Sequence, residues 1–131
     1  MLAFLCNWAA YRCYMGMCRG GAEMPSRPIF PIKVPCSGRV DPAMVLRAFE
    51  KGAEGVMVLG CKERECRYGP GPRQTERMEV QILSLMRILG LEPQRFFAAT
   101  YGFHESERLL EDMHAFVKGV SKLGETPLKS V

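Results

Sequence analysis

The sequence predicts an α/β fold in which helices flank a four-stranded parallel sheet. Short apolar runs alternate with amphipathic stretches along the chain, which is the pattern of βαβ units. One run, Gly55–Leu59, is apolar throughout, as expected of a strand that is buried on both faces of a sheet. The chain has 131 residues, of which 47% are apolar, so it is long enough for one domain with a substantial core.

Three further runs are predicted as strands: Leu2–Leu5, Ile29–Val34 and Arg95–Thr100. Pro31 lies in the second of these runs. Because proline has no N–H to donate to a neighbouring strand, we expect this strand at an edge of the sheet. Right-handed crossovers then favour the strand order 2-1-3-4. The expected architecture is a flavodoxin-like three-layer sandwich.

Helix signals separate the predicted strands. Asp41 and Pro42 are typical of the first positions of a helix, and Gly52 is typical of its end. Two more helices are predicted from apolar residues at helical spacing: Met78, Ile82, Leu85, Met86 and Leu89 before Gly90, and then Leu109, Met113, Phe116, Val117 and Val120. The crossover 9–24 should also hold a helix, although three glycines weaken that prediction.

Composition limits the kinds of partner and location. The formal net charge is +4 and no block of Lys and Arg stands out, so we expect no nucleic-acid partner. No segment approaches the roughly 18 apolar residues of a membrane span, and the first residues lack the basic flank of a signal peptide. We therefore expect a cytoplasmic protein with reduced thiols. Residues 1–124 are expected to form a single domain, followed by a flexible tail at 125–131.

Four of the six cysteines are predicted at one edge of the sheet. Cys6, Cys36 and Cys61 each follow a predicted strand, and Cys66 lies in the loop that begins at Cys61. Because the carboxyl ends of parallel strands meet at one edge, and ligands collect there, these thiols should lie close together. Four thiolates suit zinc or an iron–sulfur cluster.

Other interpretations of the cysteines stay open at this point. Buried thiols are common in protein cores, and zinc sites more often contain tight Cys pairs, whereas Cys6 and Cys36 are isolated. A cysteine nucleophile would need a histidine base, but His104 and His114 have no evident catalytic context. Cys13 and Cys18 either belong to the packing of their segment or replace one ligand.

The residues around the cysteines suit an anionic metal–sulfur centre. Basic side chains in this region would moderate its charge, and the turn after Cys36 would offer backbone N–H groups to sulfur. These basic residues are Arg39, Lys62, Arg64 and Arg67. Apolar or loop-forming groups are expected to flank the site: Trp8, Met15, Met17 and the 69–72 loop, Gly-Pro-Gly-Pro. No phosphate-binding glycine motif is present, so we do not expect this chain to bind a flavin.

Three stretches carry a resemblance to a known family. They are Phe4–Trp8, the Cys-Ser-Gly-Arg-Val-Asp-Pro stretch at Cys36–Pro42, and Gly60-Cys61 followed by Cys66 and Tyr68. With the intervening segment Ala48–Val56, they resemble the delta-subunit family of methyl-viologen-reducing hydrogenase, the MvhD family, over nearly the whole chain.

The resemblance implies an electron-transfer subunit with a 2Fe-2S cluster held by Cys6, Cys36, Cys61 and Cys66. It also implies a place between a hydrogenase, formate dehydrogenase or other redox module and the flavin-containing A-type flavoprotein of a heterodisulfide-reductase-type complex. Such complexes perform flavin-based electron bifurcation in anaerobic metabolism. The chain itself would have no substrate pocket. The alternative from another class is a zinc-stabilised docking module without a redox role.

One position departs from the family pattern. Family members usually have the motif Cys-Asn-Trp-Cys, whereas this chain has Cys6-Asn7-Trp8-Ala9. Either the position is not an essential ligand, or Cys13 substitutes for it. The set of four ligands is complete without it.

Overall fold

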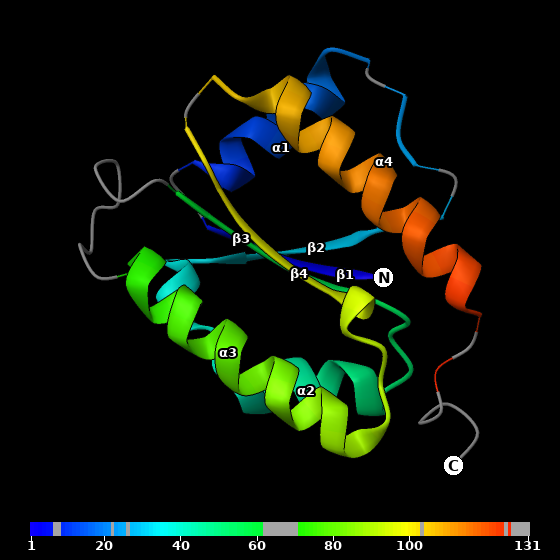
Figure 1. Ribbon diagram of the computed structural model, residues 1–131. Helices are drawn as coiled ribbons and strands as arrows, with labels where there is room; N and C mark the ends of the chain where they lie inside the picture. Colours follow the sequence, from blue (N-terminus) through cyan, green and yellow to red (C-terminus); the bar gives the residue numbers. More distant parts are fainter. Residues whose placement is uncertain are drawn as a thin grey trace.

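The computed structural model describes residues 1–6, 9–21, 23–25, 27–61, 71–102, 104–124 and 126, with side chains described from residue 75 onward in the third helix (Figure 1). The elements, in chain order, are β1 Leu2–Cys6, α1 Ala10–Arg19, β2 Phe30–Val34, the 3₁₀ turn η1 Ser37–Arg39, α2 Pro42–Glu50, β3 Val56–Cys61, α3 Gly71–Leu89, the 3₁₀ turn η3 Pro93–Arg95, β4 Phe96–Tyr101 and α4 Ser106–Leu123.

The four strands form one parallel sheet in the order β2-β1-β3-β4, which confirms the predicted fold class and strand order. Helices α1 and α4 cover one face of the sheet, and α2 and α3 cover the other (Figure 1). Pro31 lies in the edge strand β2, as its missing N–H requires. All four strands run in the same direction, so their carboxyl ends meet at one edge.

Alternating side chains of the central strands divide the core in two. Ala3 and Leu5 pack under α1 and α4, whereas Phe4 packs toward α2 and α3. In β3, Met57 and Leu59 join the first group, and Val56 and Val58 join the second. Because β3 is central and covered on both faces, all six of its residues are buried.

The predicted start of α2 is confirmed. Asp41 accepts a hydrogen bond from the Met44 backbone N–H at 2.9 Å, and Pro42 occupies the first helical position. The helix ends at Glu50, and Gly52 follows with a φ of +105°, a conformation that favours glycine. This short helix leads directly into β3.

The helix predicted in the first crossover is confirmed, since α1 is a regular helix over Ala10–Arg19 although Gly16 lies within it. Its buried side chains recur at helical spacing: Ala10, Cys13 and Met17. A Cβ at Gly16 would lie 3.5 Å from Ser106 Oγ of α4, so this glycine lies where α1 meets α4. Tertiary packing therefore outweighs the low helix propensity of glycine.

Helix α3 ends at Leu89, before the predicted stop Gly90, but it begins at Gly71, inside the segment predicted as a loop. Of the five apolar residues at helical spacing, Met78, Ile82 and Met86 are buried, whereas Leu85 and Leu89 are 37% and 43% exposed. The apolar residues of α3 extend around the helix and include the exposed Val80 and Ile88. Their periodicity alone therefore does not define the buried face.

Three of the four strands end later than predicted, and β2 ends at Val34 as predicted. Cys6 is the last residue of β1, Cys61 is the last of β3, and β4 extends to Tyr101. Strand β2 begins one residue late, at Phe30. Of the predicted tail, the structure describes Thr126, which is buried. Across the described ranges, no helix is both long enough and apolar enough to cross a bilayer.

Candidate metal–sulfur site

Three of the four predicted ligand cysteines lie at the carboxyl edge of the sheet. Cys6 ends β1, Cys61 ends the neighbouring strand β3, and Cys36 lies two residues after the end of β2 on the other side of β1. Their exposed fractions are 1%, 1% and 4%, in the order Cys6, Cys61 and Cys36. The topology therefore brings three thiols from separate segments to one water-excluded edge.

Cys66 lies outside the described residues, in the segment 62–70. This segment follows Cys61 directly and precedes Gly71, the first residue of α3. Strand β3 ends and helix α3 begins at the carboxyl edge of the sheet (Figure 1). Lys62, Arg64 and Arg67 also fall outside the described part, whereas Arg39 is described and exposed.

The donor chemistry at this edge fits a metal–sulfur group. The described cysteines form no disulfide with one another. Buried thiolates are soft donors that match iron or zinc. Within the residues that the structure describes, however, no three Cys, His, Asp or Glu side chains surround a common point. The three described thiols therefore share an edge and do not form a ready three-ligand site for one ion.

The turn after Cys36 is held in place by polar contacts. The Arg39 N–H donates to the Cys36 carbonyl at 3.0 Å, and the Val40 N–H donates to the Ser37 carbonyl at 3.2 Å. The Arg39 N–H belongs to the stretch whose backbone N–H groups the sequence suggested for sulfur, but it serves the turn itself. The Ser37 side chain is 1% exposed and accepts a hydrogen bond from Thr75 Oγ1 at 2.9 Å.

Cys13 belongs to the same buried cluster as Cys6 and Cys61. It is 1% exposed, and its Sγ donates to the Gly102 carbonyl, which follows β4, at 3.2 Å. Ala9, the position of the family cysteine, is fully buried in this cluster as well. Cys13 lies one helical turn beyond Ala9, since its N–H donates to the Ala9 carbonyl.

Cys18 is exposed at the end of α1 and lies outside that cluster. The pKa of Tyr14 is raised. Burial is the main cause, and the charge interaction and hydrogen bond with Cys18 add to it. Of the residues expected to flank the site, Met17 is buried in the core and Met15 is half-buried. Trp8 and residues 69 and 70 lie outside the described residues, and the side chain of Pro72 is likewise not described.

A buried tyrosine beside Cys61 was not predicted from the sequence. Tyr101 aligns with Cys61 in the sheet, and its hydroxyl donates to Asp112 Oδ2 at 2.7 Å. Burial, followed by this hydrogen bond, raises the pKa of Tyr101 far above its usual value. The Arg108 guanidinium lies 4.7 Å from the centre of its ring. The predicted strand ended at Thr100, one residue short of the register position that would have indicated Tyr101.

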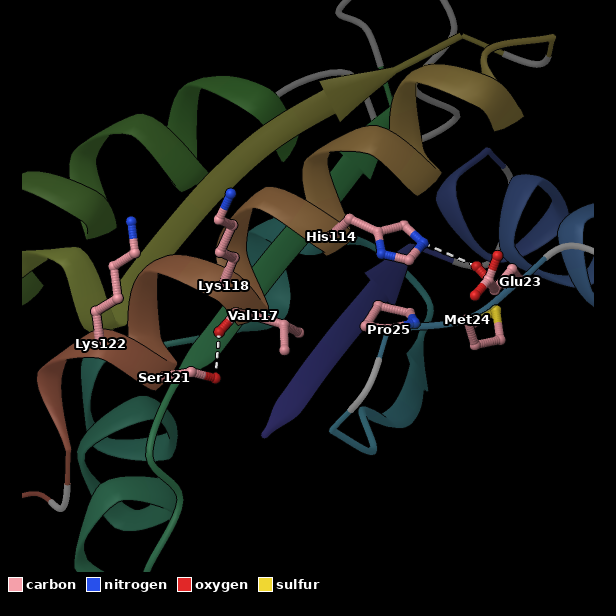
Figure 2. A pocket seen from close by; sticks show the side chains of 8 residues that line it. All are labelled: Glu23, Met24, Pro25, His114, Val117, Lys118, Ser121 and Lys122. Atoms are coloured by element: carbon pink, nitrogen blue, oxygen red, sulfur yellow. Dashed lines mark hydrogen bonds between the residues drawn. The ribbon is translucent and has the colours of Figure 1, made fainter.

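Neither histidine lies among the described cysteines. His104 is exposed before α4, and His114 lies on α4 with Nε2 2.8 Å from the Glu23 carbonyl oxygen. Figure 2 shows this contact at one end of a shallow groove of about 590 Å³, which Lys118 and Lys122 also line. No cysteine is among the described residues that line the groove, so it is separate from the metal–sulfur edge.

The predicted family is confirmed by comparison with known proteins. Residues 1–124 match the family described as the delta subunit of methyl-viologen-reducing hydrogenase. The chain belongs to this family. The D-type iron-sulfur subunit of the F420-non-reducing hydrogenase of Archaeoglobus profundus is 32% identical to this delta-family chain over 126 residues, which is 95% of the chain and 90% of that relative.

Two further relatives differ greatly in length. The D-type iron-sulfur subunit of the vhu F420-non-reducing hydrogenase of Methanocaldococcus jannaschii is 32% identical over an alignment of 140 positions, which covers 99% of the chain and 96% of that relative. The A-type subunit of the ferredoxin/F(420)H(2)-dependent CoB-CoM heterodisulfide reductase of Methanosarcina acetivorans is 35% identical over 126 residues. This delta-family chain is covered to 95% in that match but spans only 16% of the longer relative.

Proposed function

We propose that this chain is an electron-transfer subunit that holds a 2Fe-2S cluster through Cys6, Cys36, Cys61 and Cys66. The observation that carries the proposal is the placement of three buried thiols at the carboxyl edge of the sheet, where β1, β2 and β3 end. The names of the relatives from Archaeoglobus profundus and Methanocaldococcus jannaschii, which call them iron-sulfur subunits, support it. We further propose that residues 1–124, the matched range, form a single iron–sulfur domain.

The donor set alone suits either a zinc ion or an iron–sulfur cluster, since both can take four thiolates. A four-cysteine zinc site gathers all four sulfurs around one ion, whereas a 2Fe-2S cluster takes two thiolates on each iron. The names of the D-type relatives, which call them iron-sulfur subunits, favour the cluster.

When bound, the cluster would accept and release one electron at a time. The chain's own contribution is to hold the thiolates, exclude water from them and set the local charge, all of which influence the reduction potential. The fully buried Ala9 and the buried Cys13 close the α1 side of this edge. Cys13 is a reserve donor beside the four proposed ligands, since its thiol lies in the same cluster as Cys6 and Cys61.

We also propose that the partner on one side is an A-type flavoprotein of a heterodisulfide-reductase complex. In the Methanosarcina acetivorans relative, a segment similar to this whole chain is part of the A-type polypeptide itself. When two domains are fused in one protein, their separate counterparts in another organism are candidates to bind each other. The other partner would be a hydrogenase, as the family description indicates, or a formate dehydrogenase or similar module. Electron bifurcation would be the activity of that whole complex, and the cytoplasm its location.

Metal analysis tests the proposed cofactor. The protein is purified without oxygen, and iron, acid-labile sulfide and zinc are measured per chain together with the visible spectrum. We expect a brown protein in which iron and sulfide occur in the proportions of one 2Fe-2S cluster per chain. A colourless protein with stoichiometric zinc would instead support a docking module, and a metal-free protein with reactive thiols would indicate thiol chemistry.

A further inference from the structure

A buried pair of hydroxyl groups joins two segments that lead to the cysteines. Ser37 follows Cys36 directly and is 1% exposed, and Thr75, in the early part of α3, is 4% exposed. Thr75 Oγ1 donates to Ser37 Oγ at 2.9 Å across 38 residues of sequence. An alanine and a valine would fill the same space without burying polar groups, so this pair is more than packing material.

The absence of a side chain at Gly60 leaves room for Ser37. A Cβ added at Gly60 would lie 2.5 Å from Ser37 Oγ, which is closer than real Cβ atoms approach other atoms, and 3.0 Å from Ser37 Cβ, which is tighter than most real contacts. Gly60 does not have a positive φ, so its backbone conformation does not require glycine. It is the missing side chain that lets η1 rest against β3 one residue before Cys61.

Thr75 brings the early part of α3 to this point, since it is four residues into that helix. Its hydrogen bond fixes α3 against the turn that follows Cys36. The turn after Cys36, the strand that ends at Cys61 and the early part of α3 therefore meet at Ser37.

We propose that Ser37, Gly60 and Thr75 are positioning residues that hold Cys36 and Cys61 at the spacing the cluster requires. This inference rests on the proposed cluster. Hydrogen-bonded groups behind metal ligands orient those ligands and commonly change metal affinity by about 10- to 100-fold when they are removed. The hydroxyl pair carries no electron and binds no iron; it preorganises the site before metal arrives.

The first test removes the hydrogen bond and keeps the shape. Thr75→Val and Ser37→Ala are compared with the control variant Ser121→Ala. The Ser121 hydroxyl donates to the Val117 carbonyl at 2.7 Å, in the last turns of α4 and away from Ser37. Folding is followed by far-UV circular dichroism and urea unfolding. Cluster integrity is followed by the electron paramagnetic resonance (EPR) g-values of the reduced protein and by the rate of iron loss to a chelator.

We expect Thr75→Val and Ser37→Ala to fold and to lose iron about tenfold faster than the unmodified chain, with shifted g-values. Ser121→Ala should match the unmodified chain in both cluster readouts. If the unmodified chain carries the cluster and Thr75→Val has the same g-values and rate of iron loss, the positioning role is wrong while the proposed function stands. If the unmodified chain carries no iron, the proposed function fails and this inference fails with it.

A second test exchanges the two contacting residues. Gly60→Ala alone should lose most of its iron, because the new Cβ displaces Ser37 and the turn behind it. The double variant Ser37→Gly with Gly60→Ala removes the two Ser37 atoms that the new Cβ would crowd, so it should recover iron relative to Gly60→Ala, up to the level of Ser37→Gly alone. Equal iron content in Gly60→Ala and the double variant, with more iron in Ser37→Gly alone, would contradict the role of the contact between Ser37 and Gly60.

Discussion

Three of the proposed ligands and the control cysteine have the same thiol chemistry but different positions in the chain. These ligands are Cys36, Cys61 and Cys66, and the control is Cys18. Cys36 and Cys61 are buried at the carboxyl edge, whereas Cys18 is exposed at the far end of α1. Each of the changes Cys36→Ala, Cys61→Ala and Cys66→Ala should therefore remove most of the iron and sulfide, since a missing thiolate leaves an iron open to solvent. Metal analysis of the anaerobically purified variants measures this.

Cys18→Ala is the matched control for these variants and should keep its iron. Full cluster content in Cys61→Ala would contradict the assignment of ligands. Partial content in Cys6→Ala, which a further Cys13→Ala change abolishes, would instead show that Cys13 replaces a ligand. Cys13 is placed for this role by its burial beside Cys6 and Cys61.

Arg95 is the largest completely buried side chain among the described residues, and it joins several elements. Its guanidinium donates to the Glu54 carbonyl before β3, to Glu92 and to the Gly124 carbonyl after α4. Arg95→Met would leave these acceptors without this donor, and it should lower the free energy of unfolding by about 2–4 kcal/mol.

Urea unfolding of the purified variants measures the effect of Arg95→Met. Arg95→Lys should recover less than half of the loss, because one ammonium group cannot reach the same acceptors as the planar guanidinium. Arg19→Met, on the exposed last turn of α1, should change the free energy of unfolding by less than about 0.5 kcal/mol. A similarly small effect of Arg95→Met would contradict the anchoring role.

The same contact predicts a dependence of stability on acid. The hydrogen bond from Arg95, as the main cause, lowers the pKa of Glu92. Because the folded-state pKa lies below that of the unfolded chain, the carboxylate stabilises the fold above about pH 4.3, and this stabilisation is lost as the pH falls. The free energy of unfolding in urea is compared at neutral pH and at a pH below the folded-state pKa of Glu92. Acid should lower this free energy less in Glu92→Gln than in the unmodified chain. An equal decrease in both would contradict the role of the Glu92 carboxylate.

At the scale of elements, the sequence predicted what depends on neighbours in the chain. Pro31 identified the edge strand, and Asp41 with Pro42 identified the start of α2. The edge position of the cysteines followed from parallel strands alone. What the sequence did not reveal depends on contacts between distant residues. Gly16 fits in a helix because it meets Ser106, and the contact between Ser37 and Gly60 exists only after folding.

Helix phase is a further example of this limit. Met78, Ile82 and Met86 face the sheet, but Leu85 and Leu89 extend the apolar pattern around α3 without being buried. Tyr101 was missed because a strand end is defined by its partner strand, here by the pairing with Cys61. Both features are decided by the tertiary structure and not by local pattern.

At the scale of the whole molecule, an electron carrier needs a protein that supplies electrons and one that receives them. We expect this chain, coexpressed with an A-type flavoprotein, to elute with it as one complex in anaerobic size-exclusion chromatography, with flavin and iron in the same peak. We expect the isolated chain to lose its cluster or to dissolve poorly. A stable, cluster-loaded monomer that does not bind the flavoprotein would contradict the permanent partnership.

A redox titration followed by EPR tests the proposed electron transfer most directly. The oxidised chain should be EPR-silent, because the two ferric ions of a 2Fe-2S cluster couple to zero spin. One-electron reduction should produce a signal of one spin per chain, which disappears on reoxidation. A chain that shows no such signal at any potential and contains zinc in place of iron would contradict the account.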